Sequence, residues 1–132
     1  MRAFTFGLIV ALPLVLVLAA CGDEEAAEAP PPATPDRDAI TYFGRMILVD
    51  HLGPKAQIHL ETRDEPLWFP AVRDAVAFTL LPGEARDIQA IYVTDMAKSE
   101  GWEHPRAWAE AEDLLYVIGS EKRGGMGALE AV

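Results

Sequence analysis

Cysteine is almost absent from this sequence, since the 132 residues contain only Cys21. A single cysteine cannot form a disulfide within the chain, so the stability of the folded part must come from packing. Catalytic motifs are also absent: there is no HExxH, no CxxC and no phosphate-binding glycine loop. The serines, Ser99 and Ser120, lie outside any nucleophile-elbow motif, and the adjacent side chains of Asp50 and His51 would diverge on a strand. The sequence therefore predicts a protein that is not an enzyme.

Basic residues are scarce as well. The chain has 11 lysines and arginines against 21 aspartates and glutamates, which gives a formal net charge of −10. An acidic surface argues against nucleic acid and against anionic lipid headgroups as partners. It suits a soluble domain, a basic protein partner or the attraction of cations.

Residues 1–20 have the layout of a secretory signal peptide, with a basic start followed by an apolar run. The run is nearly long enough to span a bilayer, but Gly7 and Pro13 weaken a long helix. It ends with Leu18-Ala19-Ala20-Cys21-Gly22, which resembles the lipobox of bacterial lipoproteins, where a lipid is attached to the cysteine. We therefore expect a lipid on Cys21, an anchor in the inner or outer membrane, and a domain that faces the periplasm.

The remainder of the chain divides by composition. Residues 21–38 are rich in proline, glutamate and alanine and have no apolar periodicity, which predicts a flexible, solvated tether. We expect a first ββα unit at residues 39–87 and a second, incomplete β-rich unit at residues 88–132. This alternation of short strands with one helix predicts the α+β class.

Within these units, residues 42–49 and 55–61 predict two strands that pair as a hairpin. The second strand alternates between apolar and polar residues, so we expect it to be half-buried, with His59 facing solvent. Residues 88–94 and 114–118 predict two more strands. A helix is expected to begin at Pro70 and to end before Pro82-Gly83. Its apolar residues recur with helical spacing: Val72, Ala75, Val76, Thr79 and Leu80.

Methionine and histidine are the side chains best suited to chemistry here, because thioether and imidazole donors bind soft transition metals such as Cu(I). Taken alone, a methionine more often fills a gap in a core. Met46 lies in an apolar segment, Met96 at a strand end, and His51 before the Gly53-Pro54 turn. On a regular strand Met46 and His51 would point to opposite faces, so they converge only if the strand ends or bulges between them.

Four segments in this order resemble the NosL family of lipoprotein copper chaperones, and the resemblance runs from about Tyr42 to Val132. The segments are Tyr42-Phe43-Gly44-Arg45-Met46, Asp50-His51-Leu52-Gly53-Pro54-Lys55-Ala56-Gln57-Ile58, Tyr92-Val93-Thr94-Asp95-Met96 and Gly124-Gly125-Met126-Gly127-Ala128. The resemblance implies two small ββαβ-type units, and relative to the family the second lacks its C-terminal helix and strand. We expect either that a partner completes this unit or that the sequence is a truncated product.

The resemblance also implies a function in denitrification. Members of the family bind Cu(I) outside the cytoplasm and help to deliver copper to nitrous oxide reductase during its maturation. The expected partners are therefore the reductase, its maturation proteins and the membrane, which is reached through the lipid anchor. Whether the protein forms a homodimer is left open.

Three ligands follow from the resemblance. Met46 matches the methionine of the family's Cys-x-Met motif, whose cysteine position is occupied by Gly44. Met96 matches a later methionine, and His51 matches the histidine of the turn motif. Because a thiolate is absent from this set, the alternative is a metal-free scaffold that docks on the reductase or on its membrane partners.

Overall fold

The computed structural model describes residues 28–83 and 87–132 of the chain. The predicted signal peptide and lipid-bearing Cys21 therefore lie outside the described residues. The described elements, in chain order, are η1 (Leu48–Asp50), β1 (Ala56–Leu60), β2 (Leu67–Phe69), α1 (Val72–Leu80), β3 (Ile88–Thr94), β4 (Trp108–Glu110), η2 (Ala111–Asp113) and η3 (Gly125–Gly127). Within these ranges, no helix is long and apolar enough to cross a membrane.

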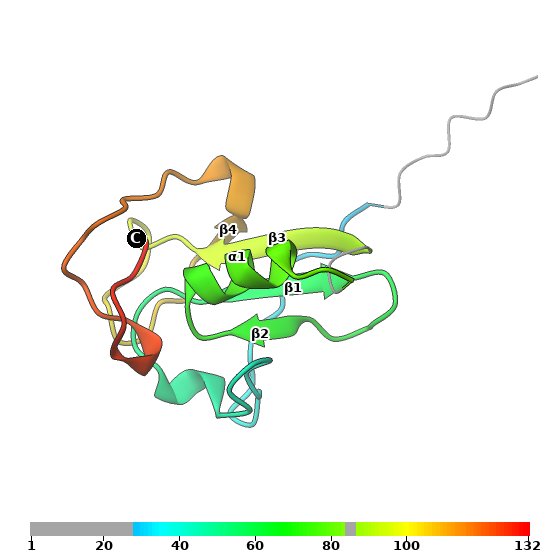
Figure 1. The fold of residues 1–132 in the computed structure, drawn as a ribbon, viewed down its shortest axis with the longest axis horizontal. Helices are drawn as coiled ribbons and strands as arrows, with labels where there is room; N and C mark the ends of the chain where they lie inside the picture. Colours follow the sequence, from blue (N-terminus) through cyan, green and yellow to red (C-terminus); the bar gives the residue numbers. More distant parts are fainter. Residues whose placement is uncertain (1–27, 84–86) are drawn as a thin grey trace, which may run out of the picture.

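The strands form one antiparallel sheet in the order β2-β1-β3-β4, and α1 packs across one of its faces (Figure 1). This combination of a sheet and a helix confirms the predicted α+β class. The division into two ββαβ-type units is not confirmed. β3, from the predicted second unit, pairs with β1, from the predicted first unit, so both contribute to the same sheet.

The central strand β1 is buried along its whole length, whereas the sequence predicted that one of its faces would be open. His59 is only 5% exposed. Its Nε2 lies 2.8 Å from Oε1 of Gln57, and its ring packs edge-on against Tyr92, with the centroids 5.6 Å apart. The prediction that His59 faces solvent is therefore wrong, and its burial lowers the pKa of the imidazole.

The second face of β1 is covered by residues 30–33, which we call the docked arm. The backbone N–H of Ala33 donates to Oε1 of Gln57 at 2.7 Å, and Nε2 of Gln57 donates to the carbonyl of Ala33 at 3.0 Å. Further along the arm, the hydroxyl of Tyr92 donates to the carbonyl of Pro30 at 2.8 Å. We expected the whole of residues 21–38 to be a solvated tether, but this part of it is bound to the sheet.

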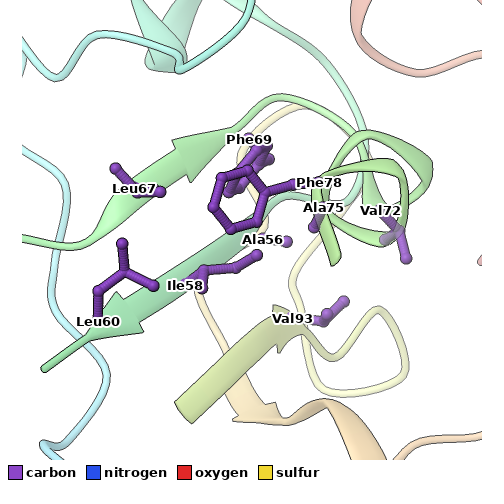
Figure 2. Packing of buried hydrophobic residues seen from close by; sticks show 9 residues of the cluster. All are labelled: Ala56, Ile58, Leu60, Leu67, Phe69, Val72, Ala75, Phe78 and Val93. Atoms are coloured by element: carbon purple, nitrogen blue, oxygen red, sulfur yellow. The ribbon is translucent and has the colours of Figure 1, made fainter. Parts of the chain in front are cut away.

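The hydrophobic core lies between the sheet and α1, as Figure 2 shows. It consists of Ala56, Ile58, Leu60, Leu67, Phe69, Val72, Ala75, Phe78 and Val93. The buried face of α1 is rotated from the predicted one: Val76 is 52% exposed and Leu80 is 77% exposed, whereas Phe78 is fully buried. The reason is aromatic packing, because the ring of Phe78 contacts those of Phe69 and Tyr42, with centroids 5.5 and 5.2 Å apart.

Two predicted strands are not formed. In residues 42–49 the chain turns at Arg45, whose φ of 53° is left-handed, and the 3-10 helix η1 follows. The predicted hairpin with β1 is therefore wrong, and β1 pairs with β2 and β3 instead. Residues 114–118 are also irregular, and Leu115 in this segment is 96% exposed. The strand β4, which the sequence did not suggest, occupies the sheet edge beside β3.

Candidate metal-binding site

Met46 lies in the turn before η1. Its backbone N–H donates to Oγ1 of Thr41 at 3.1 Å, and its carbonyl accepts from the N–H of Thr41 at 2.8 Å. The residue is 36% exposed. Its thioether is therefore held on a short, hydrogen-bonded turn at the surface, and not in the apolar strand that the sequence predicted.

Gly44 lies directly beside Met46. A Cβ atom built on Gly44 would stand 3.1 Å from Cε of Met46, which is the mobile end of that side chain. Gly44 is not among the residues with positive φ, so its backbone conformation is open to other amino acids. A side chain at position 44 would consequently contact the side chain of Met46. Because residue 44 is glycine, it supplies no metal-binding atom beside the thioether.

His51 follows η1, and its backbone N–H donates to the carbonyl of Leu48 at 3.2 Å. Its ring atom Nε2 is buried and has no hydrogen-bond partner. Leaving such an atom unpaired costs about 1–3 kcal/mol. The C-terminal segment closes over this residue at Gly125, where an added Cβ would lie 3.2 Å from Cβ of His51. The imidazole thus has a free nitrogen in an enclosed position.

Met96 lies two residues beyond the end of β3 and is half-buried. Its Sδ is 4.0 Å from Oγ1 of Thr94. It lines a cavity of about 240 Å³ together with side chains from the C-terminal segment, among them Leu114, Tyr116 and Val132. Its neighbour Asp95 is engaged elsewhere, because an ion pair with Lys98 at 3.2 Å holds the pKa of that carboxyl below its ordinary value.

Lys55 connects the turn of His51 to the strand end that carries Met96. Its backbone N–H donates to Oγ1 of Thr94 at 2.9 Å, and its carbonyl accepts from the N–H of Thr94 at 2.9 Å. Its ammonium group donates to the carbonyls of His51 at 2.7 Å and Gly53 at 3.2 Å. Burial lowers the pKa of Lys55 to about 8. His51 and Met96 are therefore tied to the same end of the sheet through one residue.

Met46 has no comparable tie to the other two predicted donors. In residues 28–83 and 87–132, no hydrogen bond joins the side chains of Met46, His51 and Met96. The same ranges contain no group of three or more His, Cys, Asp or Glu side chains placed to hold a metal ion.

Sequence reasoning did not find Glu130. This residue is 2% exposed, and both of its carboxylate oxygens are buried without a hydrogen-bond partner. Burial raises the pKa of the carboxyl to about 7, against the opposing effect of the positive charge of Arg73. Its side chain fills the space beside Gly124, where no other side chain would fit. No local sequence pattern indicates such burial, because an acidic residue ordinarily faces water.

Comparison with known proteins gives a consistent result. The family model described as NosL matches residues 32–132. The copper-binding lipoprotein NosL of Achromobacter cycloclastes is 42% identical over 127 residues, covering 94% of this chain and 65% of that protein. The protein of the same name from Stutzerimonas stutzeri is 34% identical over 127 residues, covering 92% of this chain and 64% of its own. The chain thus spans just under two thirds of the length of these curated relatives.

A solved structure resembles the fold as well. It is the crystal structure of the copper chaperone NosL from Shewanella denitrificans, with a TM-score of 0.66 and 26% sequence identity. The match covers 77% of this chain and 79% of that one. The sheet and helix described above are therefore shared with a protein whose structure is known.

Proposed function

The chain belongs to the NosL family, and from this premise we propose that it binds Cu(I) and helps to deliver it to nitrous oxide reductase during maturation of that enzyme. The two curated relatives are named copper-binding lipoproteins, and the solved relative is named a copper chaperone. In this proposal copper is cargo that the protein passes on, so the chain needs no catalytic group of its own.

The observation that carries the proposal is the unpaired Nε2 of His51. A buried nitrogen without a hydrogen-bond partner is unfavourable unless something binds to it. A neutral imidazole and thioethers together form a donor set that suits Cu(I). Met96 lies at the same end of the sheet as His51, since Lys55 bonds to both the His51 turn and Thr94. Met46 adds an exposed thioether from the turn before η1.

The absence of a thiolate fits delivery better than storage. Gly44 stands where a side chain would touch Met46, so no charged sulfur supports the thioether there. Neutral donors hold Cu(I) less firmly than a thiolate does, which favours release to a partner with a stronger site.

The ligands can be tested by titrating Cu(I) against a competing chelator. We expect one Cu(I) per chain and a loss of affinity of about tenfold or more, equal to about 1.4 kcal/mol, in each of Met46→Ala, His51→Ala and Met96→Ala. Met126→Ala is the matched control, because Met126 is a 60% exposed methionine on η3. Unchanged affinity in all three ligand variants would exclude this donor set.

Delivery is tested separately, by measuring the copper content of nitrous oxide reductase in cells that carry the variants. We expect the enzyme to be copper-poor with Met96→Ala and copper-replete with Met126→Ala. Equal copper loading in both strains would argue against delivery even if Cu(I) binding had been demonstrated.

The second candidate is a metal-free scaffold, which is favoured by Gly44 at the expected cysteine position and by the net charge of −10. A pull-down from membrane extracts distinguishes the two. A complex that forms equally well without copper and with both methionines replaced supports the scaffold. A complex that requires copper supports the chaperone.

The lipid anchor on Cys21 is part of the same proposal. It rests on the lipobox-like residues before Cys21 and on the names of the relatives. Replacing Cys21 with alanine should release the protein from the periplasmic side of the membrane, and membrane fractionation measures this. Fractionation of the unchanged protein assigns it to the inner or the outer membrane. If the Cys21→Ala variant stays in the membrane as firmly as the unchanged protein, the lipid is not the anchor.

A further inference from the structure

A hollow of about 360 Å³ lies between the chain that follows the docked arm, the turn of η1 and the loop before β4. Its walls carry three basic side chains, from Lys55, His104 and Arg106. No acidic residue lines it, although aspartates and glutamates outnumber lysines and arginines by 21 to 11 in the chain. Its volume is within the range of about 300–1,000 Å³ that is typical of small-ligand sites.

Lys55 lines this hollow and is only 5% exposed. An ammonium group has three N–H donors, and two of them are used by the carbonyls of His51 and Gly53. Neither ion pair of the described residues involves Lys55. A buried cation without a counter-ion is unfavourable, and an anion in the hollow would accept its third hydrogen bond.

Arg106 and His104 lie on the exposed wall of the same hollow, and neither forms an ion pair among the residues that the structure describes. A guanidinium group binds a carboxylate through two parallel hydrogen bonds. The remaining walls are largely apolar and include the indole of Trp108 and the ring of Pro35. These surfaces suit a ligand with one negatively charged end and an apolar body.

We propose that this hollow binds an organic carboxylate, with its charged end on Lys55 and Arg106 and its apolar body against Trp108. The carboxylate is either a free small molecule or the carboxyl end of a protein chain, since both offer the same chemistry. The site is separate from the proposed copper donors, because none of Met46, His51 and Met96 lines it.

Binding is measured by calorimetry on the full, metal-free chain in detergent, with detergent alone as the blank. The probes are benzoate for a free carboxylate and N-acetylphenylalanine for a chain end, each compared with its uncharged amide. We expect saturable binding of at least one acid and at least about tenfold weaker binding of its amide, as expected for loss of a charge-assisted hydrogen bond. The acid that binds more tightly identifies the source.

The variant Arg106→Gln tests the charged wall at an exposed position, where the fold tolerates replacement. We expect it to weaken binding by about tenfold. Arg63→Gln is the matched control, because Arg63 is an exposed arginine that lines a different hollow. The metal-free chain is used so that failure of the copper proposal leaves this result interpretable.

Several outcomes overturn the proposal. If acid and amide bind equally well, the hollow recognises only the apolar body of the ligand. If Arg63→Gln weakens binding as much as Arg106→Gln, the loss of affinity comes from the overall charge of the protein. Unchanged binding in Arg106→Gln places its guanidinium in the neighbouring hollow, which Arg106 shares with Glu100 and Glu103. Absence of saturable binding to either acid rejects the site.

Discussion

The region from β1 to β3 and the segments that flank it bury their side chains very differently. Every member of the cluster between the sheet and α1 lies between Ala56 and Val93, and the segment before β1 adds the fully buried Leu48. In the flanking segments, residues 40–51 and 111–132, Leu115 is 96% exposed and Ile118 is 78% exposed. The flanking chain is organised by turns, 3-10 helices and isolated bridges.

The residues that stabilise the fold and the residues proposed to bind copper therefore lie in different parts of the chain. Two of the proposed copper donors, Met46 and His51, belong to the segment before β1, and Met96 follows the end of β3. The core supplies a fixed base, and the donors stand on irregular chain beside it, where loops can carry binding groups without disturbing the packing. The next four predictions test this division, beginning with the largest expected effect.

The core should be intolerant of truncation at Phe78. Its ring is fully buried and contacts Phe69, so Phe78→Ala should lower the free energy of unfolding by about 3–5 kcal/mol. Urea denaturation followed by circular dichroism measures this. Leu80→Ala on the same helix is the control, since Leu80 is 77% exposed. Similar losses in both variants would mean that the buried face of α1 is not the one described.

Glu130 should make the stability depend on pH, although it lies in the flanking chain. The folded state raises its pKa from 4.5 to about 7, so folding favours the protonated carboxyl. Its contribution to stability is therefore complete below about pH 4.5 and is lost as the pH rises through about 7. Glu130→Gln should remove this dependence and stabilise the protein at pH 8 by about 2 kcal/mol.

Unfolding curves at pH 5 and pH 8 check this prediction, and Glu121→Gln, at an exposed position, is the matched control. A stability difference between Glu130→Gln and the unchanged protein that is the same at both pH values would contradict the burial of Glu130. It would also mean that the C-terminal segment does not lie against the first turn of α1, whose Arg73 and Asp74 influence this carboxyl.

Gly44→Cys should strengthen Cu(I) binding in the segment before β1. A thiol at this position would lie beside the thioether of Met46, whose flexible end need move only a few tenths of an ångström. We expect an affinity gain of more than about tenfold, or about 1.4 kcal/mol. Chelator competition measures it, with Gly101→Cys as the control, because nothing lies within 4 Å of that position. An equal gain from both thiols would show that position 44 has no special relation to a copper site.

Leu115→Ala should have the smallest effect. The side chain is 96% exposed, so its removal should change the free energy of unfolding by less than about 0.5 kcal/mol. The same urea experiment tests this. A loss above about 1 kcal/mol would show that the flanking segment packs in solution, and the contrast between the two regions would then be smaller than described.

Local sequence was sufficient to predict where β3 and α1 lie, although the buried face of α1 differs from the predicted one. It failed at residues 42–49, which have a high β propensity but turn at Arg45. The apolar run at residues 114–118 failed for another reason: a strand needs a hydrogen-bonding partner, and β3 pairs with the short β4 instead. Pairing between distant segments decides these cases, and no single window of sequence contains it.

The same limit applies to the candidate site. Residue types and the family resemblance suggested Met46, His51 and Met96, and this ligand set stays a prediction. The enclosure of His51 depends on Gly125, which is far away in sequence. The burial of Lys55 and Glu130 likewise depends on distant chain that covers them. The solvent exposure of a site therefore depends on tertiary contacts, whereas the kind of donor atom follows directly from the residue type.

The docked arm determines how far the domain can travel. Because Pro30 and Ala33 are hydrogen-bonded to the sheet, the stretch between a lipid on Cys21 and the folded domain would end at Pro30 and not at Asp38. At about 3.5 Å per residue, a tether from Cys21 to Pro30 would be at most about 30 Å long. With a lipid on Cys21, such a tether would confine the domain to a thin layer above the bilayer, where a membrane-held recipient would be met at high effective concentration. Recipients that diffuse beyond this layer would be out of reach.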